Sequence, residues 1–214
     1  MKRVQKGEYG YLAYKKKIES IKTVIYFAIP LALFFAGLIA TGTKKNLLTL
    51  VAVLGILPAS KNAVLMIMYL KSRGISAAAY ETTESALQKA GETVLSNMTV
   101  LYEMVFTTQE HTYEVPCMFI YAGSVCGYLP SSGANKKKEG RKDGKKKTEK
   151  PDSLHVTLEK HIDQTLKREG ISVNVKIFDG EEAFIKRVNE LKPLEKAADT
   201  PRKAIAKVLK DISL

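Results

Sequence analysis

The sequence predicts a membrane-anchored α+β protein, in which a transmembrane hairpin of two helices precedes a small cytosolic domain. Two observations lead to this prediction. Two long apolar segments, 23–43 and 47–70, lie near the N-terminus and are separated by only three residues. After them, at 75–214, short β-rich stretches alternate with amphipathic helical ones in the order β-β-β-α-β-α.

Both apolar segments are long enough to cross a bilayer. The first carries no charged residue in 21 positions, and the second carries only Lys61 in 24. At about 1.5 Å rise per residue they would form helices of roughly 31 and 36 Å, against a hydrocarbon core of about 30 Å. A cleaved signal peptide is the alternative for the first segment, but its apolar run exceeds the roughly 7–15 residues of a signal h-region.

Basic residues set the expected orientation of this hairpin. The arm at 1–22 contains seven Lys or Arg residues against two Glu, and Lys71 and Arg73 follow the second segment. The positive-inside rule therefore predicts that both ends of the hairpin are cytoplasmic and that a short turn lies outside. We expect an integral protein of a bacterial-type inner (plasma) membrane, with most of the chain in the cytoplasm.

Small residues recur at every fourth position in both segments, which predicts close packing of the two helices. Packing within the hairpin is favoured over homodimerisation. The predicted packing residues are Ala28, Ala32, Ala36 and Ala40 in the first segment, and Gly55, Ala59 and Ala63 in the second.

The second segment also contains an unusual polar group, Pro58, Ser60, Lys61 and Asn62. Proline removes a helical hydrogen bond, so a kink is expected. A charge within a membrane raises the hypothesis of an ion path, a transporter subunit or a lipid contact. The simpler interpretation is that Lys61 extends its ammonium group to the inner interface, because the first segment offers no acidic partner.

The elements expected in the domain form one sheet covered by helices on one face. Cys117 and Cys126 are expected on the same side of a strand hairpin, reduced and buried rather than catalytic. A capping box at 179–182 is expected to start the helix after the last strand. The expected elements are a helix at 76–90, an antiparallel meander of strands at 98–108, 113–121 and 125–129, a helix at 154–166, a strand at 171–178, and helices beginning near 181 and 201.

Residues 131–150 form a lysine-rich insert with almost no apolar side chains, which predicts disorder. The whole chain has a net charge of +12, and each lysine near an anionic membrane contributes about 1 kcal/mol. Anionic lipid head groups are therefore the expected partner, and a solvated loop without function is the alternative. Nucleic acid is less favoured because the insert lacks aromatic residues for base stacking. The predicted anion-binding residues are Lys136, Lys137, Lys138, Arg141, Lys142, Lys145, Lys146, Lys147 and Lys150.

No motif in the sequence predicts catalysis, a metal or a cofactor. Glu103-Met-Val and Glu114-Val-Pro lack the lysine of a metal-dependent nuclease. His155, Glu159 and Asp163 align on one helix face, where we interpret them as the polar side of an amphipathic helix and not as metal ligands. The predicted function is a membrane-anchored interaction or scaffold module with an unidentified protein partner, and an enzyme is disfavoured. The alternative is a membrane-tethered protein that binds or processes nucleic acid.

Overall fold

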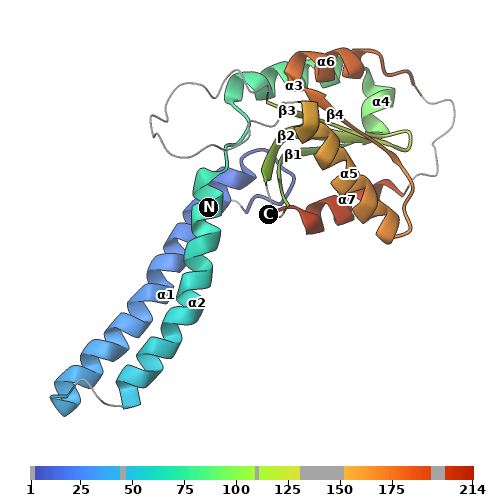
Figure 1. Ribbon diagram of the computed structural model, residues 1–214. Coiled ribbons are helices and arrows are strands. Elements are labelled where there is room, and N and C mark those ends of the chain that lie inside the picture. The colour runs from blue at the N-terminus through green and yellow to red at the C-terminus, as the bar shows by residue number, and fades with distance from the viewer. Residues whose placement is uncertain (1–2, 44–46, 109–110, 131–151, 194–200) are drawn as a thin grey trace. The chain divides into compact units, whose positions relative to one another are not determined.

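The computed structural model describes residues 3–43, 47–108, 111–130, 152–193 and 201–214. The chain divides into two compact units (Figure 1). One unit is Met1–Val4 with Gly10–Arg73, and the other is Gln5–Tyr9 with Gly74–Leu214. Two long apolar helices followed by a small α+β unit are present, as the sequence predicted.

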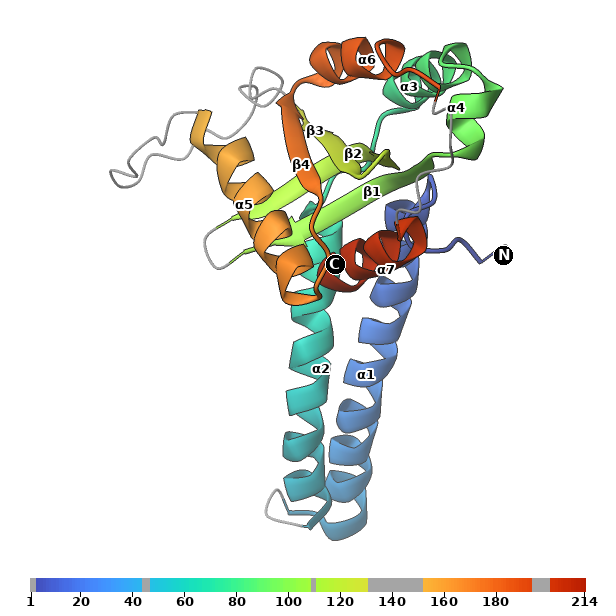
Figure 2. The ribbon, with the colours of Figure 1, turned by 90° about the vertical axis from the view of Figure 1, so that its right-hand side faces the viewer.

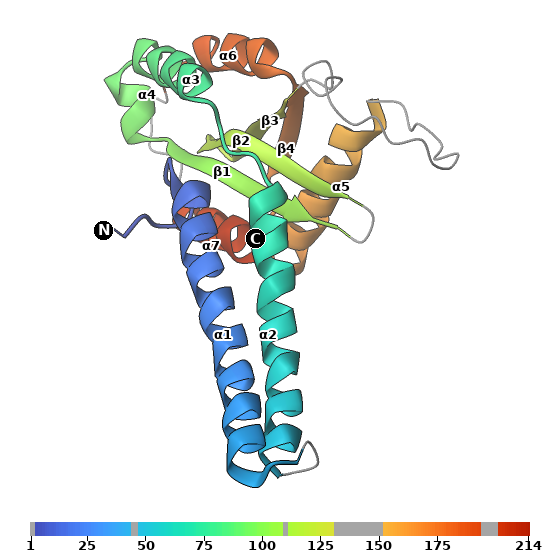
Figure 3. The same cartoon turned by 90° about the vertical axis from the view of Figure 1, so that its left-hand side faces the viewer.

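Helices α1 (Tyr11–Thr41) and α2 (Leu47–Lys71) lie side by side and antiparallel (Figure 3). α1 begins at Tyr11, twelve residues before the apolar segment predicted at 23–43. The extra turns are polar but form a good helix, with Lys15 and Glu19 paired across one turn at 3.6 Å. Hydropathy identifies the apolar part of a helix, but it does not identify the residue at which the helix begins.

The second unit contains a four-stranded mixed sheet in the order β1-β2-β3-β4. The first three strands form the predicted antiparallel meander, and β4 pairs with β3 in parallel. A parallel neighbour requires a crossover connection, and helix α5 provides it. The strands are β1 (Thr99–Thr107), β2 (Thr112–Tyr121), β3 (Ser124–Leu129) and β4 (Asn174–Asp179).

Helices cover both faces of this sheet, which corrects the prediction of one covered face (Figure 2). α5 and α7 pack on one face through Leu158, Ile162 and Leu209. α3, α4 and α6 pack on the other face through residues that include Leu87 and Phe184. The helices are α3 (Ala77–Lys89), α4 (Glu92–Ser96), α5 (Asp152–Arg168), α6 (Glu181–Asn189) and α7 (Arg202–Ile212).

The reason for the two-sided cover lies in β2. Its run Cys117–Tyr121 is entirely apolar and buried, as expected for a central strand that faces a core on both sides. The predicted capping box was also wrong. Asp179 pairs with Leu129 as the last residue of β4, and Gly180 precedes α6 without a side-chain cap.

Segments remote in sequence cover the outer edge of β1. The Tyr102 amide donates to the Gly7 carbonyl at 2.9 Å, and the Leu214 amide donates to the Val105 carbonyl at 2.7 Å. The Lys6 ammonium donates to the Ser213 carbonyl at 2.6 Å. Edge strands that are covered in this way do not offer a template for pairing with other chains.

The outer edge of β4 is capped by a side chain of α5. The Ile177 amide donates to Glu159 Oε1 at 2.7 Å, and Lys176 Nζ lies 3.5 Å from the same oxygen. Glu159 therefore joins α5 to the strand that this helix precedes.

We expect Glu159→Ala to lower the free energy of unfolding by about 2 kcal/mol, because it removes a charged acceptor and leaves a backbone amide unpaired. Asp163→Ala is the matched control on the same helix. Asp163 makes a surface pair with Lys167 at 2.7 Å, which is worth at most about 0.5 kcal/mol. Urea denaturation followed by pulse proteolysis measures both, and equal losses would contradict the capping role.

Candidate functional site

The large apolar side chains of α1 and α2 face outward. Of the 22 large hydrophobic residues that are exposed among the described residues, 20 lie on these helices, and the exceptions are Tyr9 and Val156. Only 17% and 11% of the most apolar window of each helix is buried. The core helix of a soluble protein buries its apolar stripe. Both helices are long and apolar enough to cross a membrane.

The contact between α1 and α2 differs from the predicted one on the α1 side. The ridge Ala28, Ala32, Ala36 and Ala40 is exposed, whereas Thr23, Pro30 and Gly37 are buried. A step of four residues advances about 40° around a helix, so a four-residue stripe winds away from its partner. A seven-residue step falls only about 20° short of two full turns and stays in contact.

On α2 the predicted small residues lie on the contact face. Ala59 is fully buried and Ala63 is half-buried. A Cβ atom added to Gly55 would lie 3.1 Å from Cγ of Pro30. The close approach of the two backbones therefore depends on this side of α2, with Pro30 as the opposing residue.

The predicted polar group of α2 does not form a cluster. Pro58, Ser60 and Lys61 are exposed, and the Ser60 hydroxyl donates to the Ile56 carbonyl at 2.9 Å. The Asn62 carbonyl instead accepts from the Thr23 hydroxyl of α1 at 3.3 Å. Because Thr23 and Asn62 are in contact, their neighbours Lys22 on α1 and Lys61 on α2 lie at similar positions along the hairpin.

The interpretation that the Lys61 ammonium group extends to an interface stays a prediction. We expect Lys61→Leu to insert and fold like the parent chain, with unchanged protein levels in the membrane. Immunoblotting of membrane fractions and protease protection measure this outcome. Loss of insertion, or loss of a cellular phenotype at normal protein levels, would assign Lys61 a role of its own.

A buried acid on α1 was not singled out from the sequence. Glu19 is 5% exposed and pairs with Lys22 at 3.0 Å and Lys15 at 3.6 Å. Its burial depends on the packing of the two helices, so no local pattern signals it. The ammonium of Lys15 also lies 5.9 Å from the ring centre of Tyr11 and 6.0 Å from that of Tyr69.

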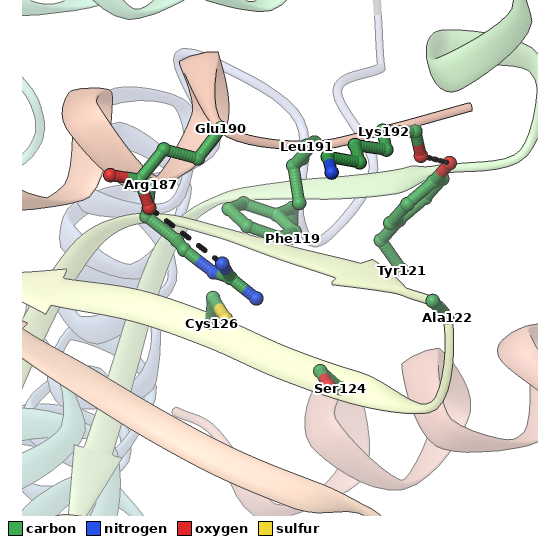
Figure 4. A pocket seen from close by; sticks show the side chains of 9 residues that line it. All are labelled: Phe119, Tyr121, Ala122, Ser124, Cys126, Arg187, Glu190, Leu191 and Lys192. Atoms are coloured by element: carbon green, nitrogen blue, oxygen red, sulfur yellow. Dashed lines mark hydrogen bonds and ion pairs between the residues drawn. The ribbon is translucent and has the colours of Figure 1, made fainter. Parts of the chain in front are cut away.

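The domain contains a pocket of about 350 Å³ between the β2–β3 hairpin and the end of α6 (Figure 4). Phe119 and Cys126 of the sheet line it on one side. Arg187 of α6 and Lys192 of the following segment line it on the other. The Tyr121 hydroxyl donates to the Lys192 carbonyl at 2.8 Å and so holds that segment on the sheet.

One charged group of the pocket, Arg187, lies on α6, and the other two, Glu190 and Lys192, follow the end of this helix. Arg187 lies 3.8 Å from Glu190, and both side chains are about half exposed. The Arg187 cation also acts on the Cys126 thiol. Burial raises the pKa of Cys126, and this cation opposes the shift without cancelling it. The thiol is therefore neutral near pH 7 and contributes to an apolar floor.

Both cysteines are free and buried, as predicted, and both lie in the cluster beneath α3 and α6. Burial raises the pKa of Cys117 well above its usual range, and the Glu84 carboxylate raises it further. Neither thiol has the lowered pKa of a reactive nucleophile.

Among the residues with a described position, no group of three or more His, Cys, Asp or Glu is placed to hold a metal ion. Glu159 and Asp163 are engaged by Lys176 and Lys167. The predicted anion-binding cations at 136–150 lie outside the described residues.

The pocket could not be found from the sequence because its residues come from 119–126 and 187–192 and form no local motif. Comparison of the chain with protein-family models, with curated proteins and with solved structures gives no match.

Proposed function

We propose that this chain is an integral membrane protein whose two-helix hairpin holds the α+β domain at the cytoplasmic face of an inner (plasma) membrane. The observation that supports this most directly is the exposed apolar surface of α1 and α2. Exposed apolar surfaces of this extent mark a membrane or a partner protein. The lengths of both helices suit a bilayer core of about 30 Å.

The distribution of basic residues supports the orientation. Because the helices are antiparallel, the start of α1 and the end of α2 lie at the same end of the hairpin. That end carries most of the hairpin's cations, whereas the turn between the helices has only Lys44 and Lys45. Excess positive charge favours the cytoplasmic side. The cations are Lys15, Lys16, Lys17, Lys22, Lys71 and Arg73.

In this proposal the domain is an interaction or scaffold module for a protein partner. The insert at 131–150 holds the domain near anionic lipid through nine cations against three acidic residues. Several such contacts at about 1 kcal/mol each are enough to bias the position of a domain that is already tethered to the bilayer.

Cysteine accessibility tests the anchor and its orientation. Thr43→Cys, beside the turn, and Ala78→Cys, on α3, each introduce an exposed thiol, while Cys117 and Cys126 are buried and give little background. An impermeant maleimide should label Thr43→Cys in intact cells and Ala78→Cys only in inverted vesicles. The reverse pattern would overturn the orientation, and extraction of the chain by alkaline carbonate would overturn the anchor.

A fluorescent reporter tests the role of the insert. Ala134→Cys carries an environment-sensitive nitrobenzoxadiazole dye in the full chain, reconstituted in nanodiscs. We expect brighter emission with anionic phosphatidylglycerol than with phosphatidylcholine, and loss of the difference at about 0.5 M salt, where the Debye length falls below about 5 Å. No difference between the lipids would leave the insert a solvated loop. Displacement by an RNA or DNA duplex would favour the nucleic-acid alternative.

A further inference from the structure

The pocket beside α6 combines an apolar floor with cations that converge on it (Figure 4). Arg187 and Lys192 contribute two positive charges and Glu190 one negative charge, so its lining carries a net charge of +1 (2 − 1). The Arg187–Glu190 pair is long and half exposed, and such pairs contribute little. Arg187 therefore keeps most of its capacity for an anionic ligand.

Two further polar groups at the pocket are available for a ligand. Among the residues that the structure describes, no hydrogen bond or ion pair engages the Lys192 ammonium or the Ser124 hydroxyl. The Lys192 backbone is nonetheless fixed, because its carbonyl accepts from the buried Tyr121 hydroxyl. The backbone of Lys192 is thus held at the rim of the pocket.

The floor favours an apolar body on the ligand. Phe119 is 1% exposed and packs against Phe184, with their ring centres 5.4 Å apart. Leu191 and the neutral Cys126 thiol extend this surface. A volume of about 350 Å³ lies near the lower end of the range for small-molecule sites, which accommodates one or two rings but not a long peptide.

We propose that this pocket binds a small organic carboxylate whose apolar body is the size of an aromatic ring. The body lies against Leu191, above the buried ring of Phe119. The carboxylate lies between Arg187 and Lys192. The guanidinium fork of arginine matches a carboxylate in two parallel hydrogen bonds, and the lysine adds a point charge. This inference is independent of the membrane anchor.

The test uses the full chain in nanodiscs of zwitterionic lipid, with 4-fluorobenzoate as the probe and ¹⁹F line broadening as the readout. 4-Fluorobenzyl alcohol is the neutral counterpart, and empty nanodiscs correct for partition into lipid. We expect saturable binding of the benzoate and at least tenfold weaker binding of the alcohol.

Three matched variants locate the site. Arg187→Gln and Lys192→Gln should each weaken benzoate binding about tenfold, whereas Lys186→Gln should leave it unchanged, because Lys186 is exposed on the same helix and does not line the pocket. Far-UV circular dichroism checks that each variant is folded. The inference is overturned if the benzoate does not bind, if the alcohol binds equally well, or if Lys186→Gln weakens binding as much as the other two variants.

Discussion

Phe184→Ala is expected to lower the free energy of unfolding of the domain by about 3–5 kcal/mol, the usual cost of removing a fully buried phenylalanine. Phe184 is 0% exposed at the centre of the contact between α6 and the sheet. Its ring centre lies 5.4 Å from that of Phe119 and 5.1 Å from that of Tyr128. The substitution removes both ring contacts and leaves a cavity under α6.

The chain has no tryptophan, so pulse proteolysis of the full chain in nanodiscs is a more sensitive measurement than intrinsic fluorescence. Lys186→Ala is the matched control, because this side chain is exposed on the same helix, and its effect should stay within about 0.5 kcal/mol. A loss below about 1 kcal/mol for Phe184→Ala would mean that α6 does not pack on the sheet as described.

The same substitution bears on the pocket. Phe184 does not line the pocket, but it supports Phe119, which does. The packing of α6 on the sheet depends on Phe184, so a substitution of this residue would also disturb the pocket that α6 helps to form. We therefore place the ligand variants on Arg187 and Lys192, which are exposed and whose loss leaves this packing intact.

Local patterns in the sequence were enough to predict most elements of the domain, but not the short helix α4 (Glu92–Ser96). The strand predicted at 113–121 is observed as β2 (Thr112–Tyr121), and the helix predicted at 76–90 is observed as α3 (Ala77–Lys89). The Ser76 hydroxyl caps α3 by accepting from the Ala79 amide at 3.2 Å. Capping residues and alternation act within a few residues, so a single sequence carries them.

The arrangement of those elements depends on distant contacts and could not be predicted in the same way. The uninterrupted apolar run Cys117–Tyr121 indicates a strand that is covered on both faces of the sheet, although only one covered face was expected. The pocket needs the β2–β3 hairpin and the end of α6 together. The burial of Glu19 likewise follows only from the packing of α1 on α2.

The alanine ridge of α1 shows most clearly what could not be predicted from the sequence, because both helices contain small residues at regular spacing. Composition identifies helices that can approach closely, but it does not identify the face that does so. In the structure the contact follows a seven-residue spacing on α1, through Thr23, Pro30 and Gly37. The alanines at four-residue spacing are exposed.

Two substitutions to phenylalanine separate the observed contact from the predicted one. Ala59→Phe places a ring at a fully buried position facing α1 and should destabilise the helix pair by about 3 kcal/mol, at the upper end of the usual cost of overpacking. Ala36→Phe places the same ring on the exposed ridge and should have little effect.

Oxidative cross-linking measures the difference. Thr23→Cys and Asn62→Cys join the two helices where the Thr23 hydroxyl and the Asn62 carbonyl lie 3.3 Å apart, and the native cysteines are buried in the domain. Mass spectrometry should find the cross-link retained in Ala36→Phe and reduced several-fold in Ala59→Phe. If Ala36→Phe were the variant that lost the cross-link, the alanine ridge would be the true contact and the seven-residue seam would be wrong. The two variants add the same side chain to the same hairpin, one at a buried position and one at an exposed position.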